Sequence, residues 1–267
     1  MNKNQRFSYS FLHTFICPYA SWLRYDCGIR GATTKWITLG NSFHYALENV
    51  HKNGEWDLKE AINLFKYEFN RIIVDEEVFI GYPEIKKLEA DGTGMLTTYT
   101  NVLSEGLLPP NPLGNEVDFK MYINGQEFVG KIDRLDGGPG NYIVTDYKTG
   151  SKMPNAWFLN HNPQFTAYAL AVLEMYGELP TKLQWYQART GRILETTRTL
   201  EDIEDLKKTI GNIKSMREQG IKYRAFHEQV CEWCDYSEGW GENKTGICSD
   251  YALEKKLEAK IQFTYEK

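Results

Sequence analysis

Three short β-type runs within residues 116–148 constrain the fold of this chain more than any other stretch. They cover residues 116–119, 130–136 and 143–148. An Asn124-Gly125 pair separates the first two runs, and a Gly-Gly-Pro-Gly loop at 137–140 separates the second from the third. Asn-Gly between apolar runs is a strong hairpin signal, because both residues tolerate the left-handed backbone of a tight turn. The sequence therefore predicts a three-strand meander.

Strand geometry would bring charged side chains from these runs together. Side chains alternate between the two faces of a strand, so Asp146 and Lys148 share a face while Tyr147 points away. If Asp133 stands at a similar height on the neighbouring strand, two carboxylates and an ammonium converge. Carboxylates bind hard cations such as Mg²⁺, and such an ion activates water and holds a phosphate oxygen. Lys148 would orient the nucleophile or neutralise charge on phosphorus.

An acid-x-Lys triplet is by itself ordinary surface charge. Others occur in the chain, for example at 57–59, 84–86, 118–120 and 205–207. The triplet at 146–148 differs in its surroundings: a Gly130-x-x-Asp133 strand precedes it, residues 142–144 form an apolar lead-in, and Thr-Gly follows it. These neighbours favour a buried site over a solvated surface.

Composition indicates a globular protein. The chain has 267 residues, 42% of them hydrophobic and 25% charged, which suffices for one large or two small domains. It has no apolar run long enough to span a membrane and no secretory leader, so we expect a cytoplasmic protein. The net charge of −5 argues against non-specific adhesion to nucleic acid, although it allows a local basic groove.

Periodicity divides the rest of the chain into helical and strand segments. We expect one domain, with a helical part at 1–112, a core at 113–198, and a helix followed by a cysteine-rich segment at 199–267. Residues 28–38 read as a loop before a helix from Leu39. After Lys148 we expect elements at 163–176 (helix), 183–188 and 191–198 (strands), 200–219 and 249–260 (helices). This order predicts an α/β or α+β fold, a mixed central sheet flanked by helices.

The five cysteines lie near the two ends of the chain, at positions 17, 27, 231, 234 and 248. In a reducing cytosol they are free thiols or metal ligands more often than disulfides. The Cys231-x-x-Cys234 pair suits a soft metal centre, whether zinc or iron–sulfur. Buried cysteines without a metal are the alternative.

Five motifs occur in an order that resembles a known family. They are Gly40-x-x-x-His44, the strand acid Glu116, Gly130-x-x-Asp133, Asp146-Tyr147-Lys148 and Gln164-x-x-x-Tyr168. Together they resemble the PD-(D/E)xK nuclease superfamily, specifically its RecB-like branch. That branch includes the nuclease domains of AddB and RecB and the CRISPR-associated nucleases with iron–sulfur clusters. The likeness extends from Ser10 to Cys248 and implies a restriction-endonuclease-like core.

The resemblance implies a role for each motif. His44, Asp133 and Asp146 would bind Mg²⁺ or Mn²⁺ with the backbone carbonyl of Tyr147, and Lys148 would serve the attacking water. Glu116 would support the site or join the metal, while Gln164 and Tyr168 would position the DNA. A lone helical histidine, or a Gln and Tyr one turn apart, is otherwise an ordinary helix face. Two further cations, Lys131 and Arg134, are either phosphate contacts or solubilising charges.

The same branch implies a [4Fe–4S] cluster. One of its cysteines precedes the helical histidine and three follow the core, which corresponds here to Cys17, Cys231, Cys234 and Cys248. The Cys17-Pro18 pair is similar to the branch's N-terminal Cys-Pro. Zinc is the main rival, and Cys27 competes with Cys17 for the first position.

The leading hypothesis is a metal-dependent deoxyribonuclease, an exonuclease acting on DNA ends or single strands in recombination, repair or phage- and CRISPR-type processing. Aromatic residues near the site, Tyr147, Trp157 and Tyr168, suggest stacking on unpaired bases. The alternatives are a catalytically silent DNA-binding or assembly subunit of a nuclease–helicase complex, and a metal-stabilised scaffold. The intact acid-acid-Lys set favours the enzyme. The chain has no Gly-x-x-x-x-Gly-Lys-Ser/Thr loop, so unwinding would need a helicase or recombination partner. No membrane partner is expected.

Overall fold

The computed structural model describes residues 6–225, 231, 234–237 and 248. The chain forms two compact units. The larger contains Arg6–Tyr9 and Thr34–Lys214, and the smaller contains Ser10–Thr33 with the described residues of Ser215–Lys267. The predicted single-domain organisation remains a prediction. None of the described helices has the length and apolar character that a membrane crossing requires.

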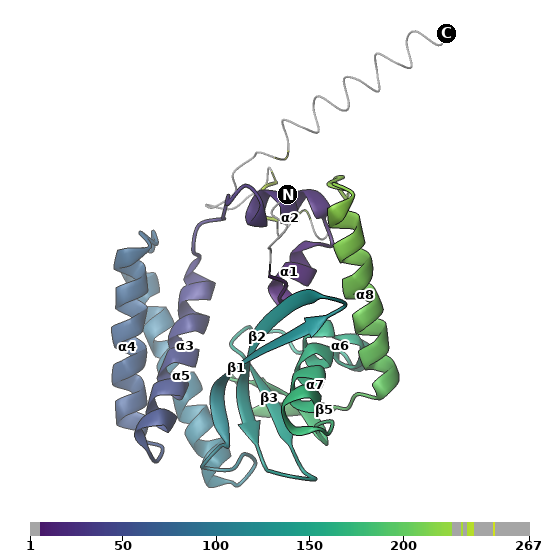
Figure 1. Ribbon diagram of the computed structural model, residues 1–267. Coiled ribbons are helices and arrows are strands. Elements are labelled where there is room, and N and C mark those ends of the chain that lie inside the picture. Colours follow the sequence, from purple (N-terminus) through teal and green to yellow (C-terminus); the bar gives the residue numbers. More distant parts are fainter. Residues whose placement is uncertain (1–5, 226–230, 232–233, 238–247, 249–267) are drawn as a thin grey trace. The chain divides into compact units, whose positions relative to one another are not determined.

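The larger unit is built on a five-stranded mixed sheet (Figure 1). Its strands lie in sequence order: β1 (Gly114–Ile123), β2 (Gln126–Asp136), β3 (Ile143–Lys148), β4 (Lys182–Gln187) and β5 (Arg192–Thr196). Only β3 and β4 pair in parallel, and the other three pairs are antiparallel. The turn between β1 and β2 has positive φ at both Asn124 (52°) and Gly125 (71°), as a tight hairpin requires. The predicted meander and mixed sheet are therefore confirmed.

Helices cover both faces of this sheet (Figure 1). On one side lie α3 (Lys35–Asn53), α4 (Leu58–Asp75) and α5 (Tyr82–Ser104), and on the other lie α6 (Ala156–His161) and α7 (Pro163–Tyr176). The first layer buries Phe43, Phe65 and Tyr99 together with Tyr147 and Tyr186 of the sheet. Side chains of β3 therefore point alternately into this core and toward α7, as strand periodicity predicted.

Two helical segments differ from the sequence prediction. Residues 35–38, expected as loop, are the first turn of α3, because the Thr34 side chain accepts the N–H of Ile37 and caps the helix there. The short helix α6 was not expected, and Asn155 caps it by accepting the N–H of Phe158. The helix predicted at 249–260 lies outside the described residues.

The smaller unit joins the two ends of the chain. It contains α2 (Pro18–Tyr25), most of α1 (Tyr9–Thr14) and the end of α8 (Leu200–Glu218). Both guanidinium nitrogens of Arg217 donate to the carboxylate of Asp26, each at 3.0 Å. The Tyr236 hydroxyl donates to the carbonyl of Ile29 at 2.7 Å. Polar contacts between residues about 200 positions apart thus hold the termini of the chain to each other.

Arg134 is structural rather than a phosphate contact. Its side chain is fully buried, and it donates to Asp136 at 2.6 and 2.7 Å and to the Tyr99 hydroxyl at 2.6 Å. Removing Asp136 would leave the buried charge of Arg134 unpaired, which is strongly destabilising. Arg134 therefore anchors β2 to α5.

Stability should fall in mild acid because of His51. This ring contacts the Tyr99 hydroxyl at 2.9 Å, and burial, reinforced by the charge of Arg134, lowers its pKa from 6.5 to about 4. Between these two pH values the unfolded chain binds a proton that the folded chain does not, so stability is lost as the pH falls below 6.5. We expect a loss of about 2 kcal/mol at pH 4.5 from this group. Denaturant unfolding at pH 7 and 4.5 should show a smaller pH dependence for His51→Gln; an unchanged dependence would contradict the assignment.

Candidate active site

Acidic residues from three adjacent strands lie in one row. Asn115 pairs with Arg134 and Val117 with Ile132, so the register sets Glu116 opposite Asp133. Arg134 pairs with Thr145, and one further step sets Asp133 opposite Asp146. The Tyr147 N–H donates to Asp133 Oδ2 at 2.8 Å, which fixes that carboxylate against β3. The meander thus gathers three carboxylates at one level of the sheet.

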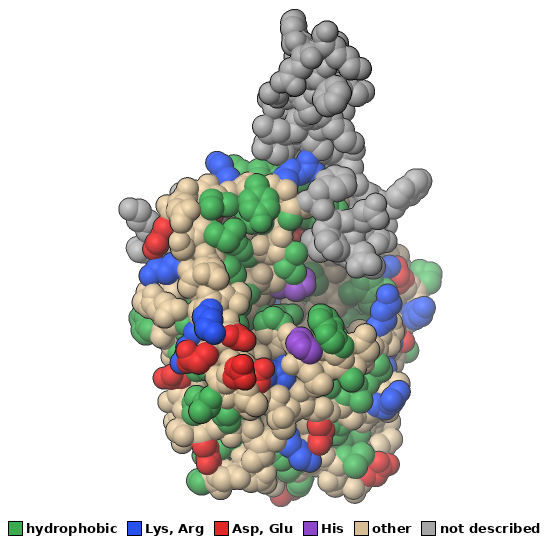
Figure 2. All heavy atoms as spheres, turned by 90° about the vertical axis from the view of Figure 1, so that its right-hand side faces the viewer, with side chains coloured by type: hydrophobic (Ala, Val, Ile, Leu, Met, Phe, Trp, Pro, Cys, Tyr) green, Lys and Arg blue, Asp and Glu red, His purple; other side chains and the backbone are tan. Residues whose placement is uncertain are grey.

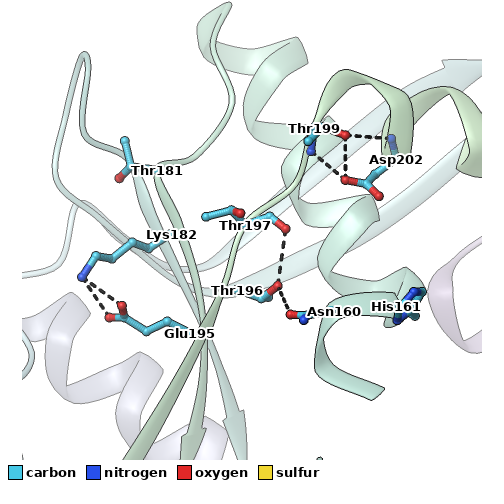
Figure 3. A pocket seen from close by; sticks show the side chains of 9 residues that line it. All are labelled: Asn160, His161, Thr181, Lys182, Glu195, Thr196, Thr197, Thr199 and Asp202. Carbon is cyan, nitrogen blue, oxygen red and sulfur yellow. Dashed lines mark hydrogen bonds and ion pairs between the residues drawn. The ribbon is translucent and has the colours of Figure 1, made fainter. Parts of the chain in front are cut away.

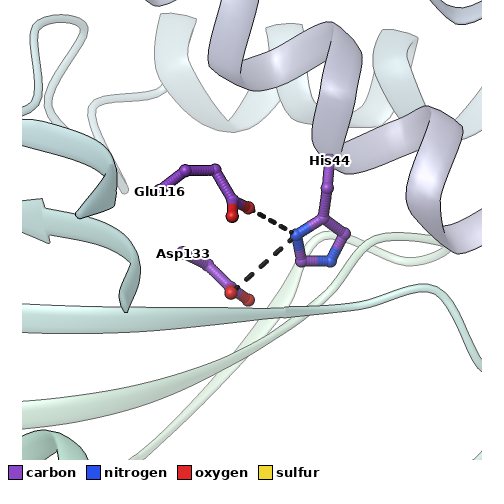
Figure 4. A group of neighbouring side chains, drawn as sticks. All are labelled: His44, Glu116 and Asp133. Carbon is purple, nitrogen blue, oxygen red and sulfur yellow. Dashed lines mark hydrogen bonds and ion pairs between the residues drawn. The ribbon is translucent and has the colours of Figure 1, made fainter. Parts of the chain in front are cut away.

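Helix α3 adds a histidine to this row (Figure 4). His44 Nδ1 lies 3.0 Å from Glu116 Oε1 and 3.8 Å from Asp133 Oδ1. Among the described residues, His44, Glu116 and Asp133 are the one group of three potential metal ligands whose donor atoms all lie within 4.8 Å of one another. Glu116 reaches this position with a φ of 48°, a conformation that is rare for a residue with a Cβ. Such strain persists only where surrounding contacts enforce it.

A second network adjoins the first on β3 and α7. Lys148 Nζ lies 2.6 Å from Asp146 Oδ2 and donates to Gln164 Oε1 at 3.2 Å. Gln164 Nε2 donates to the Tyr168 hydroxyl at 2.9 Å, which in turn donates to Asp146 Oδ1 at 3.3 Å. Asp146 Oδ2 is buried, and the Lys148 ammonium is its close partner.

The carboxylates and the cations of the site shift each other's pKa. Burial disfavours the charged form of His44, but the charges of Asp133 and Glu116 outweigh burial and raise its pKa to about 9. Burial raises the pKa of Asp133 to about 7; His44 opposes this rise and Asp146 adds to it. Burial also opposes charge on Lys148, yet Asp146 and Asp133 raise its pKa. The positive charges of His44 and Lys148 therefore stabilise the crowded carboxylates, and a divalent cation would do the same.

All seven side chains that the sequence singled out lie in these two linked networks. The set of metal-ligand candidates that the structure groups together differs from the set that the resemblance implied. The compact donor group contains Glu116 in place of Asp146, whereas the resemblance implied His44, Asp133 and Asp146. Gln164 and Tyr168 contact Lys148 and Asp146 directly. The rings of Tyr147 and Tyr168 are 3% and 4% exposed, so the expectation that they stack on bases is wrong. Trp157 is 69% exposed, and its ring stacks on His161 with centroids 4.7 Å apart.

Two residues at the site were not predicted from the sequence. Trp185 stands beside Asp146 in the β3–β4 register, and Lys148 Nζ lies 5.3 Å from the centroid of its ring. Tyr9 is close enough that the charges of Lys148 and Asp146 act on its pKa, which burial raises. Strand alternation would have placed Trp185 here once β4 was known to pair in parallel with β3. No sequence signal indicated Tyr9.

All five cysteines belong to the smaller unit, and four of them lie near one another. Cys17 and Cys248 are buried beside Tyr236, and Cys234 packs against this cluster. The Cys234 N–H donates to the carbonyl of Cys231 at 3.3 Å, as in a Cys-x-x-Cys turn. Burial raises the pKa of the Cys234 and Cys248 thiols, and the neighbouring thiols of Cys17 and Cys231 raise it further. Cys27 is exposed.

One comparison with known proteins identifies a family. The family model of the PD-(D/E)XK nuclease superfamily matches residues 6–238. Among solved structures, the chain is similar to SSO0001 at 12% identity, covering 84% of this chain and 91% of that one with a TM-score of 0.36. It is also similar to protein VC1899 from Vibrio cholerae at 13% identity, covering 82% and 58% with a TM-score of 0.24. No curated protein matches. The family match spans both networks of the site and all five motifs, and the chain belongs to the PD-(D/E)XK nuclease superfamily.

Proposed function

We propose that the protein is a metal-dependent deoxyribonuclease. The observation that carries this proposal is the junction of the two networks, where His44, Glu116 and Asp133 meet the Asp146–Lys148 pair. Carboxylate oxygens and an imidazole nitrogen suit Mg²⁺ or Mn²⁺. The compact donor group, with the Asp146 carboxylate on the neighbouring strand, fits such an ion.

The residues that would hold the ion are His44, Asp133 and Asp146 with the backbone carbonyl of Tyr147, and Glu116 as a further ligand or as the support of His44. When bound, the ion supplies Lewis-acid activation of water and charge neutralisation at phosphate. The chain's own contribution is to fix these ligands before substrate arrives: the N–H of Tyr147 holds Asp133, and the hydroxyl of Tyr168 holds Asp146.

Lys148 is placed to act on the attacking water or on the scissile phosphate. Asp146 and Gln164 hold its ammonium on two sides, and the face of Trp185 lies on a third. An ammonium held in this way stabilises developing charge without reorganising during the reaction. The resemblance implies that Gln164 and Tyr168 position the DNA strand. In addition, they would orient Lys148 and Asp146.

We infer that the substrate is DNA with a single-stranded end, cut exonucleolytically in recombination, repair or phage- and CRISPR-type processing, with a helicase or recombination protein as partner. Support comes from the resemblance and from Trp157, whose exposed ring offers a stacking surface.

Cleavage should require a divalent ion and a DNA end. We expect end-labelled linear DNA to be degraded with Mg²⁺ or Mn²⁺, to survive in EDTA, and to be degraded faster than covalently closed circles of the same sequence. Gel analysis of both substrates tests this. Rapid cutting of the circles would contradict the exonuclease assignment, and DNA binding without cleavage in either ion would favour the silent assembly subunit.

We also propose a [4Fe–4S] cluster on Cys17, Cys231, Cys234 and Cys248. Cys17, Cys234 and Cys248 lie in one buried cluster, as a shared metal centre requires. Four thiolates also suit zinc, so metal analysis distinguishes the two. The exposed side chain of Cys27 favours Cys17 as the N-terminal ligand.

A further inference from the structure

A groove lies on the same hairpin that carries Glu116 and Asp133. It has a volume of about 490 Å³, and its polar lining consists of Arg6, Ser8, Asp118, Lys120 and Lys131. We call it the hairpin groove. Three of its five polar residues are cations, although the whole chain has a net charge of −5.

Backbone pairing builds this groove. Residues 6–8 run along the outer half of β2, where the Phe7 N–H donates to the Glu127 carbonyl and the Val129 N–H donates to the Phe7 carbonyl, both at 2.9 Å. Gly130 leaves room for the Phe119 ring, since a Cβ at this position would lie 2.4 Å from a ring carbon. The groove is therefore a fixed feature of three paired segments rather than a gap between mobile side chains.

Both sides of the hairpin groove lead to the proposed catalytic residues. Lys131 precedes Asp133 by two positions on β2, and its Nζ lies 3.9 Å from Glu116 Oε2. On the other side, Ser8 is followed by Tyr9, which lies within the electrostatic reach of Lys148 and Asp146. A strand lying in this groove would pass directly to the site.

The cations of the groove pair with nearby carboxylates but remain exposed on their outer side. Arg6 and Lys120 share Glu127 at 3.0 and 3.3 Å, and Lys131 lies 3.9 Å from both Glu116 and Asp118. The three side chains are 67%, 53% and 49% exposed. Their partners Glu127 and Glu116 are only 22% and 14% exposed, so the cationic groups lie on the solvent side of these pairs, where a phosphate can reach them.

A second hollow suits a phosphate chain less well than the hairpin groove does. The larger hollow, of about 640 Å³, has Lys182 paired with Glu195 at 3.0 Å and a second carboxylate at Asp202 (Figure 3). Two carboxylates against one lysine would repel phosphate. On the face shown in Figure 2, acidic and basic side chains are interspersed, and no continuous basic track crosses it.

We propose that the hairpin groove binds the sugar–phosphate backbone of the DNA strand next to the scissile phosphate, with Arg6, Lys120 and Lys131 each contacting a phosphate. This inference rests on the proposed nuclease function only in naming the strand as the substrate.

The test measures binding apart from cleavage. A fluorescent single-stranded oligonucleotide is titrated in EDTA at several salt concentrations with the unaltered protein and with a triple variant, Arg6→Gln, Lys120→Gln and Lys131→Gln. Loss of three phosphate contacts should make the negative slope of log K against log salt shallower by about 2. It should also weaken binding tenfold to a hundredfold at low salt. The matched control, Lys59→Gln, Lys66→Gln and Lys208→Gln, removes three exposed lysines remote in sequence from the hairpin and should bind as the unaltered protein does.

The possible results distinguish failure of the proposed groove from failure of the proposed nuclease function. A triple variant that is folded by circular dichroism and keeps the full slope and affinity overturns the groove, as does an equal loss in the control. An unaltered protein that binds through these residues but cleaves no DNA under any metal supports the groove and overturns the proposed function. Under cleavage conditions, the double variant Arg6→Gln, Lys120→Gln should raise KM while leaving kcat within about twofold, as expected for binding contacts away from the reacting phosphate.

Discussion

Asp133→Asn, Asp146→Asn and Lys148→Met proteins should each cleave DNA at least about a hundredfold more slowly than the unaltered protein while remaining folded. Each substitution keeps the shape of the side chain and removes one charge from the junction of the two networks. Asp146 is 1% exposed and touches both Lys148 and Tyr168, so its charge cannot be replaced by solvent. Initial rates on end-labelled DNA at fixed Mg²⁺ or Mn²⁺, with thermal melts of every variant, measure the effect.

The matched control for this series is Glu48→Gln. Glu48 lies one helical turn beyond His44 on α3, but its carboxylate pairs with Lys52 at 2.5 Å. Its removal should leave the cleavage rate within about twofold of the unaltered protein, because an exposed pair of this type contributes little. If Lys148→Met cut at the normal rate, the lysine would have no part in the chemistry and the site would need a new assignment.

The sequence predicted the sheet well because the turn and the strand alternation that define it are encoded by neighbouring residues. Asn124-Gly125 fixes the first turn through its backbone conformation, and alternation fixes which faces Asp146 and Lys148 share. His44 was different: nothing in the periodicity of α3 distinguishes it from an exposed histidine, and only the resemblance singled it out. The contact of His44 with Glu116 depends on the packing of α3 beside β1, which no local pattern encodes.

The features that sequence analysis missed all depend on tertiary contacts. Trp185 reaches Lys148 because β4 pairs in parallel with β3, a pairing between segments 39 residues apart. The positive φ of Glu116 has no signal in the local sequence either. Burial of Tyr147 and Tyr168 follows from the helices on both faces of the sheet. An aromatic residue beside a catalytic motif is therefore as readily a core residue as a base-stacking one.

Replacing Cys234 by Ser should remove a brown chromophore and destabilise the protein. Four of the five thiols of the smaller unit lie near one another, with Cys17 and Cys248 only 8% and 7% exposed. Without a metal, burial raises the pKa of Cys234 and Cys248 and so favours their neutral thiol form. Bound iron would supply the compensating charge and hold the segment that contains Cys17 to the segments that contain the other three. Losing a metal that joins distant segments costs several kcal/mol, which corresponds to a fall in Tm on the order of 10 °C.

The measurement uses protein purified anaerobically, with iron, sulfide and zinc analysed beside the visible spectrum and a thermal melt. Cys27→Ser is the control, since Cys27 is exposed and should leave the colour, the iron content and Tm unchanged. Colourless protein with stoichiometric zinc would overturn the cluster and keep the metal link between the termini. Protein with neither metal and an unchanged Tm in Cys234→Ser would overturn both, since the contacts of Arg217 with Asp26 and of Tyr236 with Ile29 would then suffice to hold the smaller unit together.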